Sequence, residues 1–308
     1  MRIEVERSGL VESVHGATAC VLGTDGEVLL TYGDPAAVMF PRSSNKPMQA
    51  TALVEQGLAL DGADLALAAA SHAGEDFHVA GVRRILAGAG LAEDALGCPP
   101  DLPLDPDAAH ALLRAGGAAD RVHMNCSGKH AAMLAVCAAR GWPTETYLDP
   151  GHPVQKAARD TVERLTGGPV AVTAVDGCGA PLFGFSLLGL ARAFRAAVTA
   201  APGSPERHVA DAMRAHPAYM SGTNRLDNHL MTAVPGLLVK GGAEAVLAAA
   251  LPDGRALALK ITDGAQRAVR PAAVALLRHL GVAGLDDLAT VPVLGGGEPV
   301  GAIRAVLP

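Results

Sequence analysis

The 308-residue sequence has few aromatic residues and no excess of basic ones. Only 3% of its residues are aromatic, and its formal net charge is -6. A surface that binds nucleic acid needs a positive field for the phosphates and, for single strands, aromatic side chains on which bases stack. The composition therefore argues against a nucleic-acid partner.

Long apolar runs are also missing. No segment approaches the roughly 18 consecutive apolar residues that a membrane-spanning helix needs. The N-terminal stretch MRIEVERSGL is charged from its second residue and lacks the apolar centre of a signal peptide. We therefore predict a soluble cytoplasmic protein with no membrane partner.

Cysteine is sparse and odd in number, at five residues: Cys20, Cys98, Cys126, Cys137 and Cys178. Small secreted proteins held together by disulfides carry even, closely spaced sets. Free thiols or metal ligation fit this pattern better than a disulfide framework does.

Half of the residues are hydrophobic, and local patterns divide the chain into strands at both ends and helices between them. Apolar runs around turn signals predict hairpins over 17–33 and 243–264, and a short strand over 170–175. Helical patterns cover 46–57, 64–90 with a break at 71–74, and 127–141. This order predicts an α/β fold with one mixed sheet, in which the terminal hairpins pair and a helical region is inserted.

A possible catalytic motif lies at the start of the first helix, in PRSSNKP. Ser43 and Lys46 are three residues apart, so on a helix they share a face, as a nucleophile and its base would. Lysine acts as a base only when its pKa is lowered, and the adjacent Arg42 and the helix N-terminus both favour that. The alternative is a helix cap beside a solvated lysine.

Three more polar clusters stand at the ends of apolar segments: SHAGEDFH at 71–78, NCSGKH at 125–130 and DGCGAP at 176–181. Each alone has an ordinary explanation as a helix cap, a buried cysteine or a glycine turn. In a chain with only 18% charged residues, the four clusters together predict the walls of one pocket.

Several segments together resemble the Rhizobium-type L-asparaginases, also called class 3 or the asparaginase II family: RSSNKP, SHAGEDFHV, NCSGKHAAML, LDPGHPVQ, VDGCGAPLFGFSL and AALPDGRALALKITDG. The likeness runs from about residue 8 to about residue 280. It implies a fold similar to that of serine β-lactamases and penicillin-binding proteins, with helices flanking the sheet. It also implies a single catalytic domain over 1–308, a homodimer, and hydrolysis of L-asparagine to L-aspartate and ammonia.

The resemblance implies two serine–lysine pairs as catalytic residues. Ser43 and Lys46 match one pair, and Ser71 and Lys260 match the other. One serine would attack the side-chain amide of asparagine while the other groups move protons to ammonia and from water. We favour Ser43 as the nucleophile, because backbone N–H groups at a helix N-terminus can stabilise an oxyanion.

The resemblance also implies a zinc site made by Cys126, Lys129 and Cys178. Two thiolates and a water suit zinc, but lysine coordinates only when it is neutral. The alternatives are a disulfide between Cys126 and Cys178, or two free thiols.

Four further residues are candidates for substrate binding on chemical grounds. Arg42 suits the α-carboxylate, and Asp176 suits the α-ammonium or the orientation of Lys129. His72 and His130 adjoin the pocket motifs, and each could instead support other side chains through hydrogen bonds.

One loop departs from the family pattern, and three other functions compete with the asparaginase. The loop CPPDLP at 98–103 has Asp101 and Leu102 where we expect a histidine and an aromatic residue.

The first of the competing functions is that of a penicillin-recognising receptor, whose K-[ST]-G motif is absent from the late strand LALKITDG. The others are a broader amidase or glutaminase, and a cysteine amidase using Cys126, for which no histidine is securely placed.

Overall fold

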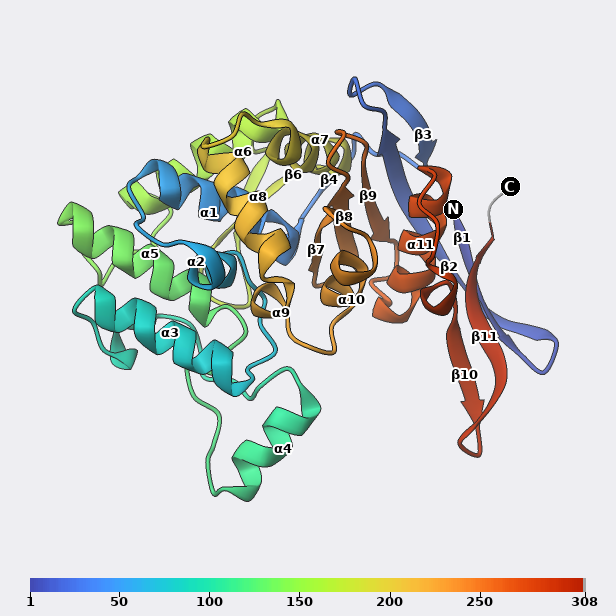
Figure 1. The fold of residues 1–308 in the computed structure, drawn as a ribbon, viewed down its shortest axis with the longest axis horizontal. Coiled ribbons are helices and arrows are strands. Elements are labelled where there is room, and N and C mark those ends of the chain that lie inside the picture. Colours follow the sequence, from blue (N-terminus) through green and yellow to red (C-terminus); the bar gives the residue numbers. More distant parts are fainter. Residues whose placement is uncertain (307–308) are drawn as a thin grey trace.

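The structure is a computed structural model that describes residues 1–306. Its main sheet has eight strands in the order β10-β11-β1-β2-β9-β8-β7, and β3 pairs with β2 outside this path. Figure 1 shows this sheet on one side of the molecule and most helices on the other. The strands are β1 (Arg2–Arg7), β2 (Leu10–Leu22), β3 (Val28–Tyr32), β7 (Leu238–Gly242), β8 (Val246–Ala250), β9 (Ala256–Ile261), β10 (Val291–Gly295) and β11 (Glu298–Val306).

Both predicted hairpins form and lie side by side. β2 pairs with β3, β8 pairs with β9, and β2 joins β9 with Thr18 opposite Lys260. Pairing of the two terminal hairpins is therefore confirmed. Every pairing in this sheet is antiparallel, so the fold is mixed in combining helices with strands and not in strand direction.

The inserted region between β3 and β7 is mainly helical, as predicted. Its helices are α1 (Lys46–Glu55), α2 (Gly62–Ala68), α3 (Asp76–Gly88), α4 (Pro106–Arg114), α5 (Ser127–Arg140), α6 (Pro153–Thr166), α7 (Leu187–Thr199), α8 (Pro205–Ala215), α9 (Pro217–Met220) and α10 (Leu226–Ala233), with α11 (Val269–His279) after the sheet hairpin. Short 3-10 turns are η1 (Arg42–Asn45), η2 (Glu93–Ala95), η3 (Gln266–Ala268) and η4 (Asp286–Leu288). A second sheet has the order β4 (Val38–Met39), β6 (Pro181–Ser186), β5 (Val172–Val175).

Local signals in the sequence explain where the site-bearing helices begin and end. Pro47 lies in the first turn of α1, where its missing N–H costs no helical hydrogen bond. α5 ends before Gly141, whose φ of 66° is the left-handed conformation that glycine adopts readily. The predicted break at 71–74 is the turn between α2 and α3. No helix within residues 1–306 is long and apolar enough to cross a bilayer.

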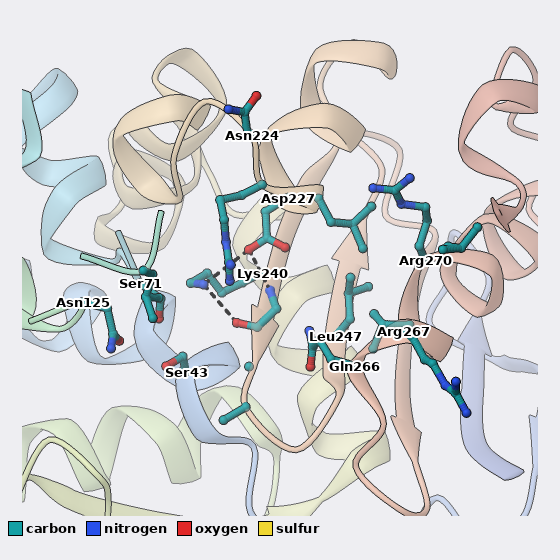
Figure 2. Close-up of a pocket in the computed structure, with 18 residues that line it drawn as sticks. Ser43, Ser71, Asn125, Asn224, Asp227, Lys240, Leu247, Gln266, Arg267 and Arg270 are labelled. Carbon is teal, nitrogen blue, oxygen red and sulfur yellow. Dashed lines mark hydrogen bonds and ion pairs between the residues drawn. The ribbon is translucent and has the colours of Figure 1, made fainter. Parts of the chain in front are cut away.

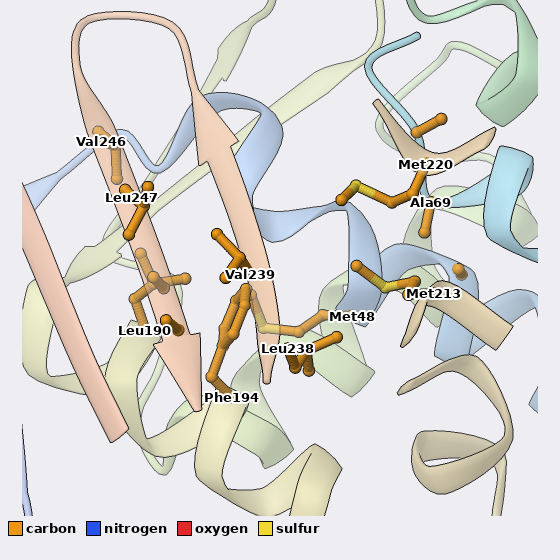
Figure 3. Packing of buried hydrophobic residues seen from close by; sticks show 14 of the residues in the cluster. Met48, Ala69, Leu190, Phe194, Met213, Met220, Leu238, Val239, Val246 and Leu247 are labelled. Atoms are coloured by element: carbon orange, nitrogen blue, oxygen red, sulfur yellow. The ribbon is translucent and has the colours of Figure 1, made fainter. Parts of the chain in front are cut away.

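The apolar core holds the first helices against the end of the sheet. All five residues of β8 are buried, and α7 packs against β2, β8 and β9. Figure 3 shows Met48 of α1 and Phe194 of α7 together with Leu238 of β7. Replacing a buried phenylalanine by alanine costs about 3–5 kcal/mol. The same packing that stabilises the fold therefore fixes α1 relative to β7.

Candidate active site

A cavity of about 500 Å³ lies between the edge strand β7 and the ends of the inserted helices. Ser43, Ser71 and Asn125 line one side of it, and Asp227 and Lys240 line another, as Figure 2 shows. Three of the four predicted polar clusters thus reach this cavity. The fourth, at 176–181, is not among the lining segments and lies behind it, next to the side chains described below.

Lys46 joins two of the clusters. Its Nζ lies 2.9 Å from Ser71 Oγ and 3.1 Å from Cys126 Sγ, and it also donates to the carbonyl of Ala70. The side chain is buried, with 1% exposed. Within the described part of the chain, no hydrogen bond joins Lys46 to Ser43. The sequence expectation paired Lys46 with Ser43, but the hydrogen bond in the structure is with Ser71.

Lys260 does not reach the serines. Its Nζ donates to the carbonyl oxygens of Glu244, at 2.6 Å, and Ile261, at 2.7 Å. It is absent from the cavity lining. The physical reason is its position: β9 lies inside the sheet, two strands away from the edge that borders Ser43.

Lys240 of β7 is the lysine that the structure brings to the cavity, and sequence reasoning missed it. Its Nζ lies 2.9 Å from the carbonyl of Gly241 and 3.4 Å from Asp227 Oδ2. Burial lowers its pKa to about 8, helped by the charge of Lys46 and opposed by that of Asp227. A lysine within the apolar run LLVKGG was the available signal.

The edge strand presents Lys240-Gly241-Gly242 beside the helix start that carries Ser43. A Cβ on Gly242 would lie 2.7 Å from the carbonyl oxygen of Pro41 and 3.2 Å from the backbone nitrogen of Ser43. Only glycine allows this approach. The strand resembles the K-[ST]-G pattern sought in β9, with glycine in place of serine or threonine.

Asp227 ties α10 to the edge strand. Its Oδ2 accepts a hydrogen bond from the backbone N–H of Gly241 at 3.0 Å and faces Lys240 Nζ. The side chain is largely buried. A buried carboxylate with these two partners holds Lys240 in place and favours its charged form.

Behind Lys46 lie the three residues of the expected zinc site. Cys126 and Cys178 are free thiols rather than a disulfide, and both are buried with Lys129. Lys129 Nζ lies 3.2 Å from Cys178 Sγ. A hydrogen bond from Cys126 lowers the pKa of Cys178, whereas the same shared proton raises the pKa of Cys126. Burial opposes the charge on Lys129, but the two thiol groups outweigh it and raise the lysine pKa.

His72 and His130 are buried and do not line the cavity. His72 Nε2 lies 2.8 Å from Ser127 Oγ, and His130 Nδ1 lies 2.6 Å from the hydroxyl of Tyr147. Burial lowers the pKa of both histidines. Their positions fit hydrogen-bonding support of the α5 start better than direct contact with a substrate.

Arg42 and Asp176 bind each other. Arg42 Nε lies 2.8 Å from Asp176 Oδ1, and Glu244 lies 4.0 Å from the same guanidinium. Arg42 has a φ of 51°, which costs a non-glycine residue about 1 kcal/mol or more. Neither residue lines the cavity. The structure therefore pairs these two candidates instead of leaving them open toward the substrate.

Comparison with known families gives a match to L-asparaginase II over residues 3–305. The chain belongs to the L-asparaginase II family. This confirms the family that the sequence motifs predicted, and it makes the protein an amidohydrolase with a small-molecule amide substrate. No curated protein sequence matches the chain.

Three solved structures that are similar to this chain are distant from it in sequence. A β-lactamase from Mycobacterium bovis has 18% identity and a TM-score of 0.43, covering 81% of this chain and 88% of its own. EstCE1, a hydrolase with promiscuous acyltransferase activity, has 12% identity and a TM-score of 0.43, covering 82% and 91%. A Bacillus glutaminase has 13% identity and a TM-score of 0.35, covering 80% and 84%. Likenesses this remote do not bear on activity.

The loop in which this L-asparaginase II chain departs from the expected family sequence runs toward the cavity. Asp101 forms a backbone bridge with Asp120, and Leu104 lines the cavity. Asp101 and Leu102 are not among the lining residues. The departure therefore lies next to the cavity wall and not in it.

Proposed function

We propose that the protein hydrolyses the side-chain amide of L-asparagine to L-aspartate and ammonia. One observation carries this proposal: a buried lysine, Lys46, is hydrogen-bonded to Ser71 at a cavity that Ser43 and Lys240 also line, in a chain of the L-asparaginase II family. Serine hydroxyls beside buried amines are the groups that nucleophilic amide hydrolysis needs.

In the proposed reaction, Ser43 Oγ attacks the side-chain carbonyl carbon of asparagine and gives up its proton to a neutral lysine. The C–N bond then breaks, and a proton is delivered to the departing ammonia. Water attacks the resulting ester, which releases aspartate and restores the Ser43 hydroxyl. Ser43 is preferred as nucleophile because it lines the cavity at the start of α1, where the positive end of the helix dipole can stabilise the oxyanion.

The two buried lysines take different parts in this scheme. Lys240, with a pKa of about 8, is neutral in a useful fraction of molecules near neutral pH and serves as the base. Lys46 and Ser71 share a hydrogen bond and pass a proton toward the leaving ammonia. Lys240 thus takes the catalytic role that the sequence prediction gave to Lys260, but with Ser43 as its partner, because Ser71 is hydrogen-bonded to Lys46.

We further propose that Cys126, Lys129 and Cys178 hold a zinc ion. Two free thiols, which suit zinc, are buried together with an amine. The pKa of Lys129 is raised, so its amine must lose a proton on binding, which the charge of the ion would favour. Within residues 1–306, no group of three or more His, Cys, Asp or Glu side chains could hold a metal ion. Bound zinc would supply a fixed positive charge behind Lys46, which contacts Cys126. Elemental analysis of the purified protein should find zinc, and Cys178→Ser should lose it. A zinc-free protein with wild-type activity would contradict this.

The decisive experiment compares the two late lysines. Lys240→Ala should lose at least about a hundredfold in ammonia release from asparagine, as expected for a general base. Lys260→Ala is the matched control, because its ammonium binds carbonyl oxygens outside the cavity, and it should keep wild-type activity. Loss of activity in Lys260→Ala with full activity in Lys240→Ala would instead make Lys260 the base. No ammonia release by the wild type would refute the asparaginase.

A further inference from the structure

The charge of the cavity wall is strongly unbalanced. Its lining contains four cationic side chains and one acidic one: Arg225, Lys240, Arg267 and Arg270 against Asp227. The carboxylate of Asp227 is already bonded to the Gly241 N–H and faces Lys240. A ligand entering this cavity therefore meets an excess of positive charge, which favours anions.

The arginines differ in how they are held. Arg267 is tethered to β2, because its Nε lies 3.0 Å from His15 Nε2 and its Nη2 lies 3.2 Å from Ser13 Oγ. Figure 2 shows its head group directed away from Lys240. Arg225 and Arg270 have no side-chain hydrogen bond or ion pair within the described residues. These two guanidinium groups are therefore available to a ligand.

Arg225 is the better placed of the two free arginines. It immediately precedes α10 and Asp227, and its charge reaches Lys240, whose pKa it helps to lower. A carboxylate bound by Arg225 would thus lie near the proposed catalytic lysine. Arg270 comes from α11, and in Figure 2 it lies on the far side of the cavity from Ser43 and Ser71.

The cavity offers no free carboxylate for an α-ammonium group. Two other acids close to the start of α1, Asp176 and Glu244, face Arg42, at 2.8 and 4.0 Å, and do not line the cavity. Its volume of about 500 Å³ is within the range of pockets that hold drug-sized ligands. Both charge and space therefore suit a substrate larger than free asparagine, with its amino group neutralised.

We propose that the cavity binds its amide substrate through a carboxylate held on Arg225, and that N-acylated L-asparagine, which is an anion, is a substrate alongside L-asparagine. The proposal rests on the proposed amidohydrolase function and specifies its substrate class. The acyl group occupies the cavity volume that free asparagine leaves empty. The chemical step is unchanged, since the same side-chain amide is cleaved and ammonia is released.

The test measures ammonia release from L-asparagine and N-acetyl-L-asparagine. For L-asparaginamide, which lacks the carboxylate but has two amides, it measures side-chain hydrolysis as the L-isoasparagine formed. For the wild type we expect N-acetyl-L-asparagine within about tenfold of asparagine in kcat/KM, and asparaginamide about 10- to 100-fold lower, as for loss of a charge-assisted hydrogen bond. Arg225→Gln should abolish the difference between asparagine and asparaginamide. Arg225→Lys should restore part of it, and Arg270→Gln, which removes the same charge from the same cavity, should keep it.

Each other outcome is informative. Hydrolysis of asparagine without N-acetyl-L-asparagine would overturn the anionic substrate class and leave the proposed function standing. Loss of carboxylate discrimination in Arg270→Gln, but not in Arg225→Gln, would overturn the assignment to Arg225. Hydrolysis of neither amide would overturn the proposed function, and this inference with it.

Discussion

The ionisation of a single buried residue, Lys240, connects the structure to a measurable pH dependence. Lys240 acts as a base only when neutral, so kcat/KM should rise as the pH increases through its pKa of about 8. Burial favours the neutral form, whereas Asp227, 3.4 Å away, favours the ammonium. These two opposing effects determine the pH range over which kcat/KM rises, called here the rising limb of the pH profile.

Replacing Asp227 by asparagine should therefore move the rising limb to lower pH. The substitution removes the negative charge that stabilises the ammonium, while the amide can still accept the Gly241 N–H bond. The measurement is kcat/KM for asparagine across the neutral and alkaline range. Glu244→Gln is the control, because Glu244 is exposed and faces Arg42. The rising limb of its pH profile should stay where it is in the wild type. A limb that stays in place or moves to higher pH in Asp227→Asn would contradict the role given to Lys240.

At the scale of elements, strand β7 and η1 pass very close to each other in the site. The backbone of Gly242 passes so near Pro41 and Ser43 that an added Cβ would lie 2.7 Å from the Pro41 carbonyl oxygen. Both partners there are backbone, so neither can rotate away. The position of Ser43, the proposed nucleophile, thus depends on a glycine in another element.

Gly242→Ala should displace η1 and cost about 1–3 kcal/mol of unfolding free energy. Because a shift of about 1 Å at a reacting group can cost about a hundredfold in rate, activity should fall by at least about tenfold. Thermal unfolding and ammonia release on the same sample measure the two effects. Gly168→Ala, where no atom lies within 4 Å of the new Cβ, should change neither. Full activity in Gly242→Ala would show that η1 tolerates displacement.

Elements with strong local signals were predictable from the sequence, and those defined by distant pairing were not. The glycine that ends α5 and the turn residues of both hairpins lie directly beside these elements in the sequence, so a local pattern reveals them. In contrast, β1 pairs with β11, from the opposite end of the chain, and no local pattern reveals such a partner. Lys240 was missed and Lys260 was predicted for the same reason, since strand order alone decides which of the two lysines lines the cavity with Ser43.

At the scale of the whole molecule, the cavity is assembled from segments far apart in sequence. Ser43 comes from the chain before α1, Arg225 from the chain before α10 and Arg270 from α11. The sequence predicted that polar clusters would form one pocket, and three of the four do line it. The arginines could not be predicted as its wall, because nothing local distinguishes an arginine beside a cavity from one on the surface.

We expect discrimination between asparagine and glutamine to depend on how these segments are placed relative to one another, and not on the size of the cavity. A cavity of about 500 Å³ has room for glutamine as well as asparagine. Under the proposed mechanism, a preference for asparagine then comes from the fixed separation between the proposed carboxylate anchor at Arg225 and the proposed nucleophile Ser43. Glutamine has one more methylene, which moves its amide carbon by about 1.5 Å and out of line with a serine held rigidly at a helix start.

We therefore expect at least about a hundredfold preference for asparagine over glutamine in kcat/KM, more than a methylene misfit alone provides. Comparing both amides in one ammonia-release assay measures it. Arg225→Gln should lower the ratio of kcat/KM for asparagine to that for glutamine. Without the contact to its carboxylate, either substrate can shift until its side-chain amide meets Ser43. Equal efficiencies in the wild type would show that the separation is not fixed, and the protein would then be a broader serine–lysine amidase. An unchanged ratio in Arg225→Gln would place the anchor elsewhere in the cavity.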